Sequence, residues 1–287
     1  LVPFRYFGLK DDVDYRPQNI PWRNKRFDPV MLSKAVQTDR RMETLWKAWE
    51  EHPGEKTLLF CCSIAHARFT QGWLSKRGVH VAAVHSGPDT DDRTASLDKL
   101  AAGELDAIVT VDLFNEGVDI PAVDRVVMLR PTESPVVFLQ QLGRGLRTAA
   151  NKTFLTVIDF VGNHRVFLDR VRILLNLTPE SPNNSLHAFL AGKTEATLPQ
   201  GCSIDIELEA IELLKKLLPS GDNNALIMEY RELRTSREIR PSPGELFRLG
   251  YNPHSLKTFD GWFDFVESEN DISTEERESL GSAGEFL

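Results

Sequence analysis

Hydrophobic runs and amphipathic stretches alternate regularly along the chain between residues 55 and 160. Short apolar runs bounded by Gly or by polar residues predict buried strands at "KTLLFCCS", "VHVAAVHSG", "LDAIVTVD", "DRVVMLR" and "FLTVIDF". Segments with helical spacing lie between them, at "AHARFTQGWLSKRG", "DDRTASLDKLAAGE" and "FLQQLGRGLR". Strands that are apolar on both faces and alternate with helices predict an α/β fold, with a mostly parallel sheet flanked by helices.

The regions on either side of this pattern differ from it. The first 42 residues are rich in Pro, aromatic and charged residues and predict an irregular connector, followed by a helix over "DRRMETLWKAWEEH". Amphipathic helices are predicted at "DIELEAIELLKKLL" and "NNALIMEYRELRTSREI". We therefore expect a connector at 1–38, an α/β domain at 39–177, a Pro/Asn/Ser/Gly linker at 178–203 and a small, mainly α-helical domain at 204–287.

Charge is distributed unevenly between the two predicted domains. Up to Leu177 the chain has 24 basic and 22 acidic residues, and after it 10 basic and 20 acidic ones, so the two parts carry +2 and −10 of the net −8. This acidity argues against a protein that coats nucleic acid by bulk charge. The acidic tail instead favours a separate partner, such as another protein.

The cysteines and the hydropathy narrow the choice of protein class and compartment further. The cysteines Cys61, Cys62 and Cys202 have neither a disulfide framework nor metal-ligand spacing, so we expect a reducing, cytoplasmic compartment and no metal site. Apolar runs are too short for a membrane span, and no leader opens the chain, so we expect no membrane association. The chain begins at Leu1 without Met, which indicates a fragment.

The stretch "FLQQLGRGLR" contains the first group of residues that suggests chemistry. Each Gly in a helix interior is about 0.8–1 kcal/mol less favourable than Ala, so Gly143 and Gly145 need another reason to be there. The polar residues at i, i+3, i+4 and i+7 share one helical face: Gln140, Gly143, Arg144 and Arg147. The opposite face is predicted to anchor the helix through Leu139, Leu142 and Leu146. Paired guanidinium groups suit a polyphosphate, and a solvated basic face is the alternative.

The stretch "TVDLFNEGVDIP" contains the second group. It follows an apolar strand and offers the Thr110 hydroxyl, a loop glycine at Gly117 and the Asp119 carboxylate, which suit phosphate, nucleotide and ribose. An ordinary loop between strands is the alternative. Ligands of parallel α/β sheets gather at the carboxyl ends of the strands, where Ser63 and His85 also fall.

The two stretches, with the strand "DRVVML" between them, together resemble motifs V and VI of superfamily 2 helicases, the DEAD/DEAH-box-like ATPases. "TLLFCCS" resembles motif IV, and "VAAVHSG" resembles the strand and turn that follow it. "PFRYFGLKDDVDYRPQNIPWRNKRFD" is similar to the segment after the first lobe in bacterial helicases related to type III restriction subunits. The resemblance covers residues 1–175 and implies the C-terminal RecA-like lobe of such a helicase.

The resemblance also implies roles for individual residues. Arg147 corresponds to the arginine finger and Arg144 to a second γ-phosphate contact, with Gln140 supporting both. The remaining implied contacts divide into a nucleotide set, Gly117 and Asp119, and a nucleic-acid backbone set, Ser63, Thr110, His85 and Gly87. Such contacts read phosphate and shape, and we expect DNA rather than RNA as the partner.

The sequence departs from the family pattern because the first lobe is absent. The only P-loop-like stretch is "AGKT", which has His187 at the position of the first glycine and no strand before it. Nor does an apolar strand end in Asp-Glu, as Mg²⁺ binding would need. We therefore expect ATP and Mg²⁺ to bind mainly to the absent lobe, and the isolated chain to be inactive. The alternative is a non-enzymatic RecA-like binding module, whereas an oxidoreductase would need a G-x-G-x-x-G turn.

Two weaker candidates complete the sequence analysis. His164 follows a strand end in "DFVGNHR", where we expect a capping or surface residue rather than a catalyst. Trp262 and Phe263 are adjacent aromatic residues that could stack on bases, but their spacing favours a place in a helical core.

Overall fold

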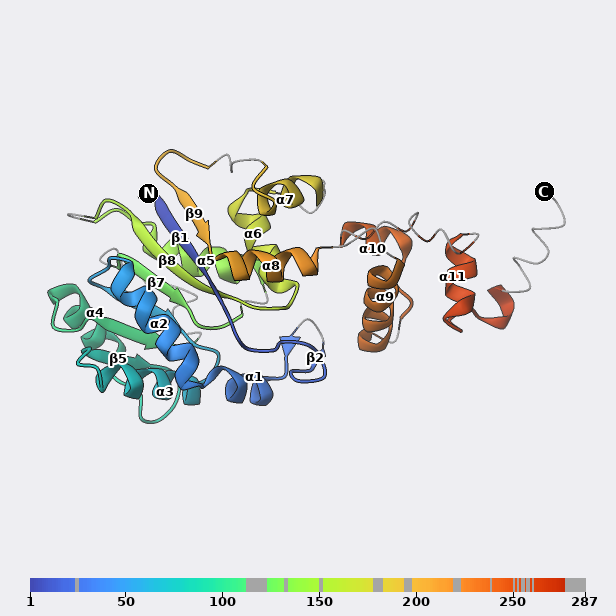
Figure 1. The fold of residues 1–287 in the computed structure, drawn as a ribbon. Helices are drawn as coiled ribbons and strands as arrows, with labels where there is room; N and C mark the ends of the chain where they lie inside the picture. Colours follow the sequence, from blue (N-terminus) through green and yellow to red (C-terminus); the bar gives the residue numbers. More distant parts are fainter. Residues whose placement is uncertain are drawn as a thin grey trace. The chain divides into compact units, whose positions relative to one another are not determined.

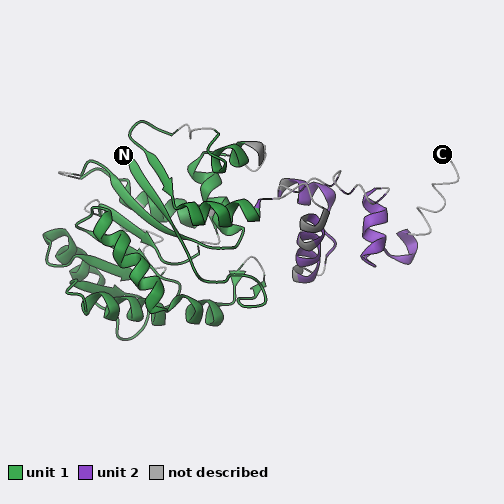
Figure 2. Ribbon diagram, in the orientation of Figure 1, with its two compact units in different colours: residues 1–177, 184–217 green, residues 178–183, 218–287 purple. Residues whose placement is uncertain are grey.

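The computed structural model describes residues 1–276 except 24–25, 112–122, 132–133, 150–151, 178–182, 194–197, 219–222, 238, 250, 252, 254–255, 257–258 and 260. The chain divides into two compact units (Figure 2). Unit 1 comprises residues 1–177 and 184–217, and unit 2 comprises residues 178–183 and 218–287.

Unit 1 is built on a sheet of seven parallel strands (Figure 1) in the order β5-β6-β4-β7-β8-β1-β9. Its strands are β1 (Phe4–Lys10), β4 (Thr57–Phe60), β5 (Val81–Val84), β6 (Ala107–Thr110), β7 (Arg125–Met128), β8 (Leu155–Val161) and β9 (Ser203–Ile206). The central strands β4, β6, β7 and β8 are buried along their whole length, as expected for a sheet covered on both faces. The predicted α/β fold class, a mostly parallel sheet flanked by helices, is confirmed.

Helices connect and cover these strands. They are α1 (Pro29–Val36), α2 (Asp39–Glu51), α3 (Ile64–Ser75), α4 (Arg93–Ala102), α5 (Pro135–Gly145), α6 (Val166–Leu174), α7 (Asn183–Leu190) and α8 (Leu208–Leu217). Several begin at a capping side chain, because Thr38, Ser63 and Asp92 each accept a hydrogen bond from a backbone N–H in the first turn. The end of α4 falls at Gly103, whose φ of 78° suits glycine.

The first residues of the chain differ from the predicted irregular connector. Residues 4–10 form β1, which lies between β8 and β9, so the prediction of irregular structure was wrong for this segment. Tyr6 is fully buried in β1 and donates a hydrogen bond from its hydroxyl to Asp159 of β8 at 2.8 Å. Charged residues at Arg5 and Lys10 interrupt the apolar run and conceal the strand in the sequence. A small antiparallel pair, β2 (Trp22–Arg23) and β3 (Arg26–Phe27), follows.

The predicted linker also contains regular structure. Helix α7 lies within residues 178–203, and β9 with α8 belongs to unit 1 instead of opening a separate helical domain at residue 204. The "AGKT" stretch begins directly after α7, and Gly192 has a φ of 67°. A helix therefore precedes this stretch where a P-loop needs a strand, as expected.

The described part of unit 2 is helical, with α9 (Asn223–Arg237), α10 (Pro243–Arg248) and α11 (Trp262–Ser268). Its core contains Tyr230 and Phe265, with Trp262 packed against it, whereas Phe263 remains 47% exposed. The core placement predicted for the aromatic pair therefore holds for Trp262 and is wrong for Phe263. None of the described helices is long and apolar enough to cross a bilayer.

Candidate functional site

Parallel strands bring several of the predicted site residues to one edge of the sheet. Ser63 follows β4, His85 follows β5, and Thr110 is the last residue of β6. The strands are neighbours, and Thr110 is in register with Phe60 of β4 and with Val84 of β5. Residues separated by more than 20 positions in the sequence therefore lie side by side at the carboxyl ends of three adjacent strands.

Ser63 has a defined local role in this edge. Its hydroxyl oxygen accepts a hydrogen bond from the backbone N–H of His66 at 3.0 Å and so caps the N-terminus of α3. The same oxygen lies 2.6 Å from the hydroxyl of Ser33 in α1, with which it shares a hydrogen bond. The amino end of α3 carries partial positive charge, which favours an anionic group nearby. Ser33 has no motif that would have identified it from the sequence.

Thr110 and His85 present buried polar atoms without protein partners. The hydroxyl of Thr110 and Nε2 of His85 have no hydrogen-bond partner within the described structure. Nδ1 of His85 accepts the backbone N–H of Gly87 at 3.1 Å, and burial together with the charge of Arg68 lowers the pKa of His85. The neutral ring therefore carries its proton on Nε2. A buried polar group left unpaired is unfavourable by about 1–3 kcal/mol, so a ligand that pairs with both atoms would be favoured.

His66 has a third buried polar atom without a hydrogen-bond partner in the described structure, and the sequence did not indicate it. Its Nε2 is buried without a partner, while Nδ1 lies 3.4 Å from Sγ of Cys62. Burial lowers the pKa of His66 well below its ordinary value, and the charge of Arg41 acts in the same direction. His66 therefore stays neutral at the start of α3.

Helix α5 carries part of the predicted arginine face. Gln140 is exposed on it, and Arg144 lies in its last turn, with a side chain outside the described atoms. The helix ends at Gly145, so the predicted helical face does not extend to Arg147, which lies exposed two residues further on. The helix end is fixed by a bond from Lys152 Nζ to the Gly145 carbonyl at 2.5 Å.

The buried face of α5 also differs from the prediction. Leu142 is buried as expected, but Leu139 is 51% exposed on the side of Gln140. Phe138 and Gln141 are fully buried in its place. Phe138 and Leu142 lie one turn apart on the helix, so its buried face runs through them and not through Leu139. Leu139 therefore belongs to the exposed face of the helix.

The two glycines of α5 have different surroundings. A Cβ on Gly145 would overlap the methyl groups of Leu155 in β8, so this glycine permits close packing of helix and sheet. A Cβ on Gly143 would meet nothing within 4 Å. The space over Gly143 is therefore open on the exposed face of the helix. The motif V residues Gly117 and Asp119 lie outside the described residues.

A buried polar network that the sequence analysis missed braces the same edge. Asp159 in β8 is fully buried, forms an ion pair with Arg170 of α6, and accepts the Tyr6 hydroxyl. Arg170 in turn donates to the backbone carbonyl of Arg130, just beyond β7, at 2.8 Å. The signal in the sequence was a lone carboxylate inside the apolar run "FLTVIDF". Burial raises the pKa of Asp159, and the charge of Arg170 opposes this shift.

A second buried ion pair holds the connector against α2. Arg41 Nε lies 3.2 Å from Asp11, and Arg41 Nη2 donates to the carbonyl of Leu129 at 2.9 Å. The Tyr15 hydroxyl donates to the same Asp11 carboxylate at 2.7 Å. Within the residues that the structure describes, no group of three or more His, Cys, Asp and Glu side chains is arranged to hold a metal ion.

Comparison with known families agrees with this geometry. Residues 40–149 match the family described as the helicase conserved C-terminal domain. Over these residues the chain is similar to the C-terminal domain of helicases, the class that the sequence resemblance indicated.

Individual relatives point to the same superfamily. "Putative ATP-dependent helicase IRC3" of Saccharomyces cerevisiae is 29% identical over 155 residues, which are 53% of this chain and 22% of that protein. The UvrABC system protein B of Kosmotoga olearia is 30% identical over 135 residues, 45% of this chain and 20% of that protein. "ATP-dependent RNA helicase abstrakt" of Drosophila melanogaster is 26% identical over 111 residues, 39% of this chain and 18% of that protein. The chain thus spans about a fifth of the length of these relatives.

Proposed function

We propose that this chain supplies the second motor lobe of an ATP-dependent nucleic-acid helicase or translocase. The observation that carries the proposal is the family match over residues 40–149, within which Ser63, His85 and Thr110 lie at or just beyond the carboxyl ends of three adjacent strands. ATP and Mg²⁺ bind mainly to a preceding lobe, and hydrolysis alternates closure of the two lobes around the nucleic acid. By itself the chain hydrolyses no ATP.

In this proposal Arg147 is the arginine finger. It stabilises charge on the γ-phosphate in the transition state, and Arg144 makes a second contact supported by Gln140. Gly117 and Asp119 face the nucleotide and its ribose. The exposed position of Arg147, just past the end of α5, supports this role because the guanidinium group can reach outward from the lobe.

The carboxyl edge of the sheet contacts the nucleic-acid backbone. The buried, unpartnered hydroxyl of Thr110 and Nε2–H of His85 are two donors that phosphate oxygens could satisfy, and Ser63 adds the positive end of α3. Gly87 leaves room beside the His85 ring, which a Cβ at this position would crowd. We propose single-stranded DNA rather than RNA as the partner of the complete enzyme.

The Arg147→Ala variant tests the finger in the longer protein that includes the preceding lobe. We expect ATP turnover to fall about a thousandfold or more, because an arginine finger contributes that much to phosphoryl transfer, while nucleotide affinity changes little. Stimulated ATPase rates and the affinity for a fluorescent nucleotide are the two measurements. Lys47→Ala, at an exposed position on α2, is the matched control. Turnover near the unmodified rate would reject the assignment of Arg147.

The Thr110→Val variant tests the nucleic-acid contact separately. It preserves side-chain shape and removes the hydroxyl, so we expect a higher concentration of single-stranded DNA to be needed for half-maximal stimulation, with the unstimulated rate preserved. Parallel titrations with DNA and RNA of one sequence decide between the two partners.

The alternative function is a non-enzymatic binding module. The −10 charge of the part after Leu177 favours it, because an acidic tail suits a protein partner. A longer protein that binds no ATP and shows no nucleic-acid-stimulated hydrolysis would establish this alternative.

A further inference from the structure

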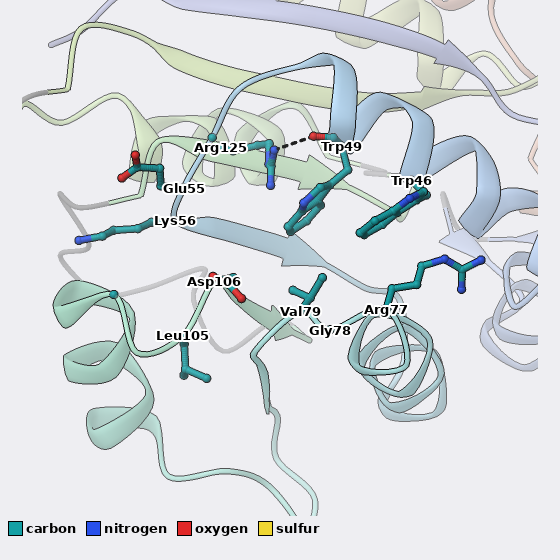
Figure 3. Close-up of a pocket in the computed structure, with 12 residues that line it drawn as sticks. Trp46, Trp49, Glu55, Lys56, Arg77, Gly78, Val79, Leu105, Asp106 and Arg125 are labelled. Atoms are coloured by element: carbon teal, nitrogen blue, oxygen red, sulfur yellow. Dashed lines mark hydrogen bonds between the residues drawn. The ribbon is translucent and has the colours of Figure 1, made fainter.

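A cavity of about 510 Å³ lies at the amino edge of the sheet, at the opposite ends of the strands from the proposed motor residues (Figure 3). Its walls come from α2 and from the segments that lead into β4, β5, β6 and β7. The residues that line the cavity include Trp46, Trp49, Lys56, Arg77, Asp106 and Arg125. No described residue assigned to nucleotide or nucleic acid lines this cavity.

Two tryptophan rings form its aromatic wall. Trp46 and Trp49 lie one turn apart on α2, with ring planes 10° from parallel and centroids 6.5 Å apart. Figure 3 shows both rings projecting from α2 into the cavity. Both are only partly buried, although they pack against the core of unit 1. Partly exposed tryptophans in a concave site are a common anchor point for a planar or apolar group of a partner.

Arg125 gives the cavity a buried positive charge. It is 2% exposed and stacks on Trp49, with its guanidinium carbon 3.7 Å from the ring centroid. Its hydrogen bonds go only to neutral acceptors: the Thr57 hydroxyl at 2.9 Å, and the carbonyls of Trp49 and His52 at 3.1 and 2.9 Å. Within the described chain it forms no ion pair with a carboxylate; burial lowers its pKa to about 10, and the more distant charges of Asp124 and Asp106 oppose this shift in part. A buried cation of this kind is stabilised by an anionic group.

The rim selects among anionic partners. Lys56 is partly exposed and adds a second positive charge, with its Nζ donating a hydrogen bond to the Ala101 carbonyl at 2.5 Å, and Arg77 is already paired with Glu43. The carboxylates of Glu55 and Asp106 also border the cavity. They would repel the evenly spaced phosphates of a nucleic-acid strand. A peptide can instead place one carboxylate near Arg125 and donate a backbone N–H group to Glu55, whereas Oδ2 of Asp106 already accepts the backbone N–H of His80 at 2.7 Å.

We propose that this cavity binds a short acidic peptide segment of a partner protein, with an aromatic side chain against Trp46 and Trp49 and a neighbouring carboxylate paired with Arg125 and Lys56. The site lies at the amino edge, so a partner held there leaves the carboxyl edge accessible. The proposal requires no nucleotide and stands independently of the motor function.

Isothermal titration calorimetry of the full chain tests it with three matched peptides. The probe is acetyl-Gly-Ser-Phe-Glu-Asp-Ser-Gly-amide. In one comparison peptide Leu replaces Phe, and in the other Gln and Asn replace Glu and Asp. We expect the probe to bind below about 1 mM and each comparison peptide to bind about tenfold more weakly, because each lacks one anchoring group.

Protein variants locate the binding. Trp46→Ala and Lys56→Glu should each weaken the probe about tenfold or more, and Lys47→Glu on the outer face of α2 should leave its affinity unchanged. Lys56→Glu changes a partly exposed side chain, so it tests the site even if Trp46→Ala unfolds. Circular dichroism verifies that each variant is folded.

Three outcomes would overturn the proposal. The first is no heat of binding up to about 1 mM probe, and the second is equal affinity for all three peptides. The third is tight binding of a single-stranded oligothymidylate that Trp46→Ala abolishes, because this would assign the cavity to nucleic acid. Probe binding that depends on Phe, on the carboxylates and on both cavity residues would support it.

Discussion

The methyl groups of Leu155 in β8 occupy the space that a side chain on Gly145 would need. Leu155 is fully buried and Gly145 is the last residue of α5, so the contact sets how closely the helix approaches the sheet. Gly145→Ala should therefore force Leu155 or the helix to move. We expect the free energy of unfolding to fall by about 1–3 kcal/mol, measured by urea denaturation.

Gly143→Ala is the matched control on the same helix. Its Cβ would meet nothing within 4 Å, so the free energy of unfolding should rise by up to about 1 kcal/mol through helix propensity. Equal losses of stability in the two variants would contradict the packing role of Gly145. If another lobe approaches α5 at Gly143, the same variant should lower ATP turnover of the longer protein despite its stable fold.

Asp159→Asn tests the buried network beneath the carboxyl edge. The substitution removes the charge that compensates Arg170, whose side chain is also buried. We expect the free energy of unfolding to fall by about 3–5 kcal/mol, because an uncompensated buried charge remains. Thermal or urea denaturation followed by circular dichroism measures the change.

Tyr6→Phe is the milder comparison in the same network. It removes one hydrogen bond of 2.8 Å to Asp159 and leaves the ion pair with Arg170 in place. The expected loss is about 1.5–3 kcal/mol, smaller than for Asp159→Asn. A larger loss for Tyr6→Phe would show that the hydroxyl, and not the ion pair, dominates this network.

His164 should make stability depend on acid. The His164 ring is buried, and its centroid lies 4.5 Å from that of the Trp22 ring and 4.7 Å from that of the Phe27 ring. Burial lowers the pKa of His164 to about 3. The ring is therefore not at the surface, while its Nδ1 accepts the backbone N–H of Val166 at 3.4 Å at the start of α6, as expected of a capping residue. Between about pH 6.5 and this folded-state pKa the unfolded chain binds more protons, so stability falls as pH decreases, by up to about 1.4 kcal/mol per pH unit.

His164→Phe keeps an aromatic ring and removes this titration. The free energy of unfolding should then decline less steeply between about pH 6 and 4, as measured by urea denaturation at each pH. His187→Gln, at an exposed position on α7, is the control for removing a histidine at the surface. Parallel slopes for the unmodified chain and His164→Phe would contradict the shifted pKa.

The apolar runs predicted the centre of the fold because those strands are buried along their whole length. β4, β6, β7 and β8 are mainly apolar, with Arg125 and Asp159 as their charged residues, and their order along the chain placed Ser63, His85 and Thr110 at one edge. β1 and β9 escaped prediction because they contain charged residues and depend on pairing with each other and with β8. Local pattern cannot report a partner strand that is distant in the sequence.

The site was predicted less completely than the fold. Spacing placed Gln140 on the exposed face of α5, but it extended the helix to Arg147, which lies past its end. The helix ends at Gly145, where Lys152 Nζ donates to its carbonyl and Leu155 packs closely, and no local pattern encodes these tertiary contacts. The cation of Arg125 was missed for a similar reason, since only the packed structure shows that it lacks a carboxylate partner.

The position of β1 between β8 and β9 also constrains the order of folding. Phe4 pairs with Leu155, and Arg5 pairs with Ser203. Strand β1 therefore pairs with β8 and β9, which are both synthesised much later than β1. Closing such long loops early is entropically unfavourable. During synthesis the sheet is therefore completed only after β9 has emerged from the ribosome, and until then β1 exposes the unpaired edge that β9 later covers.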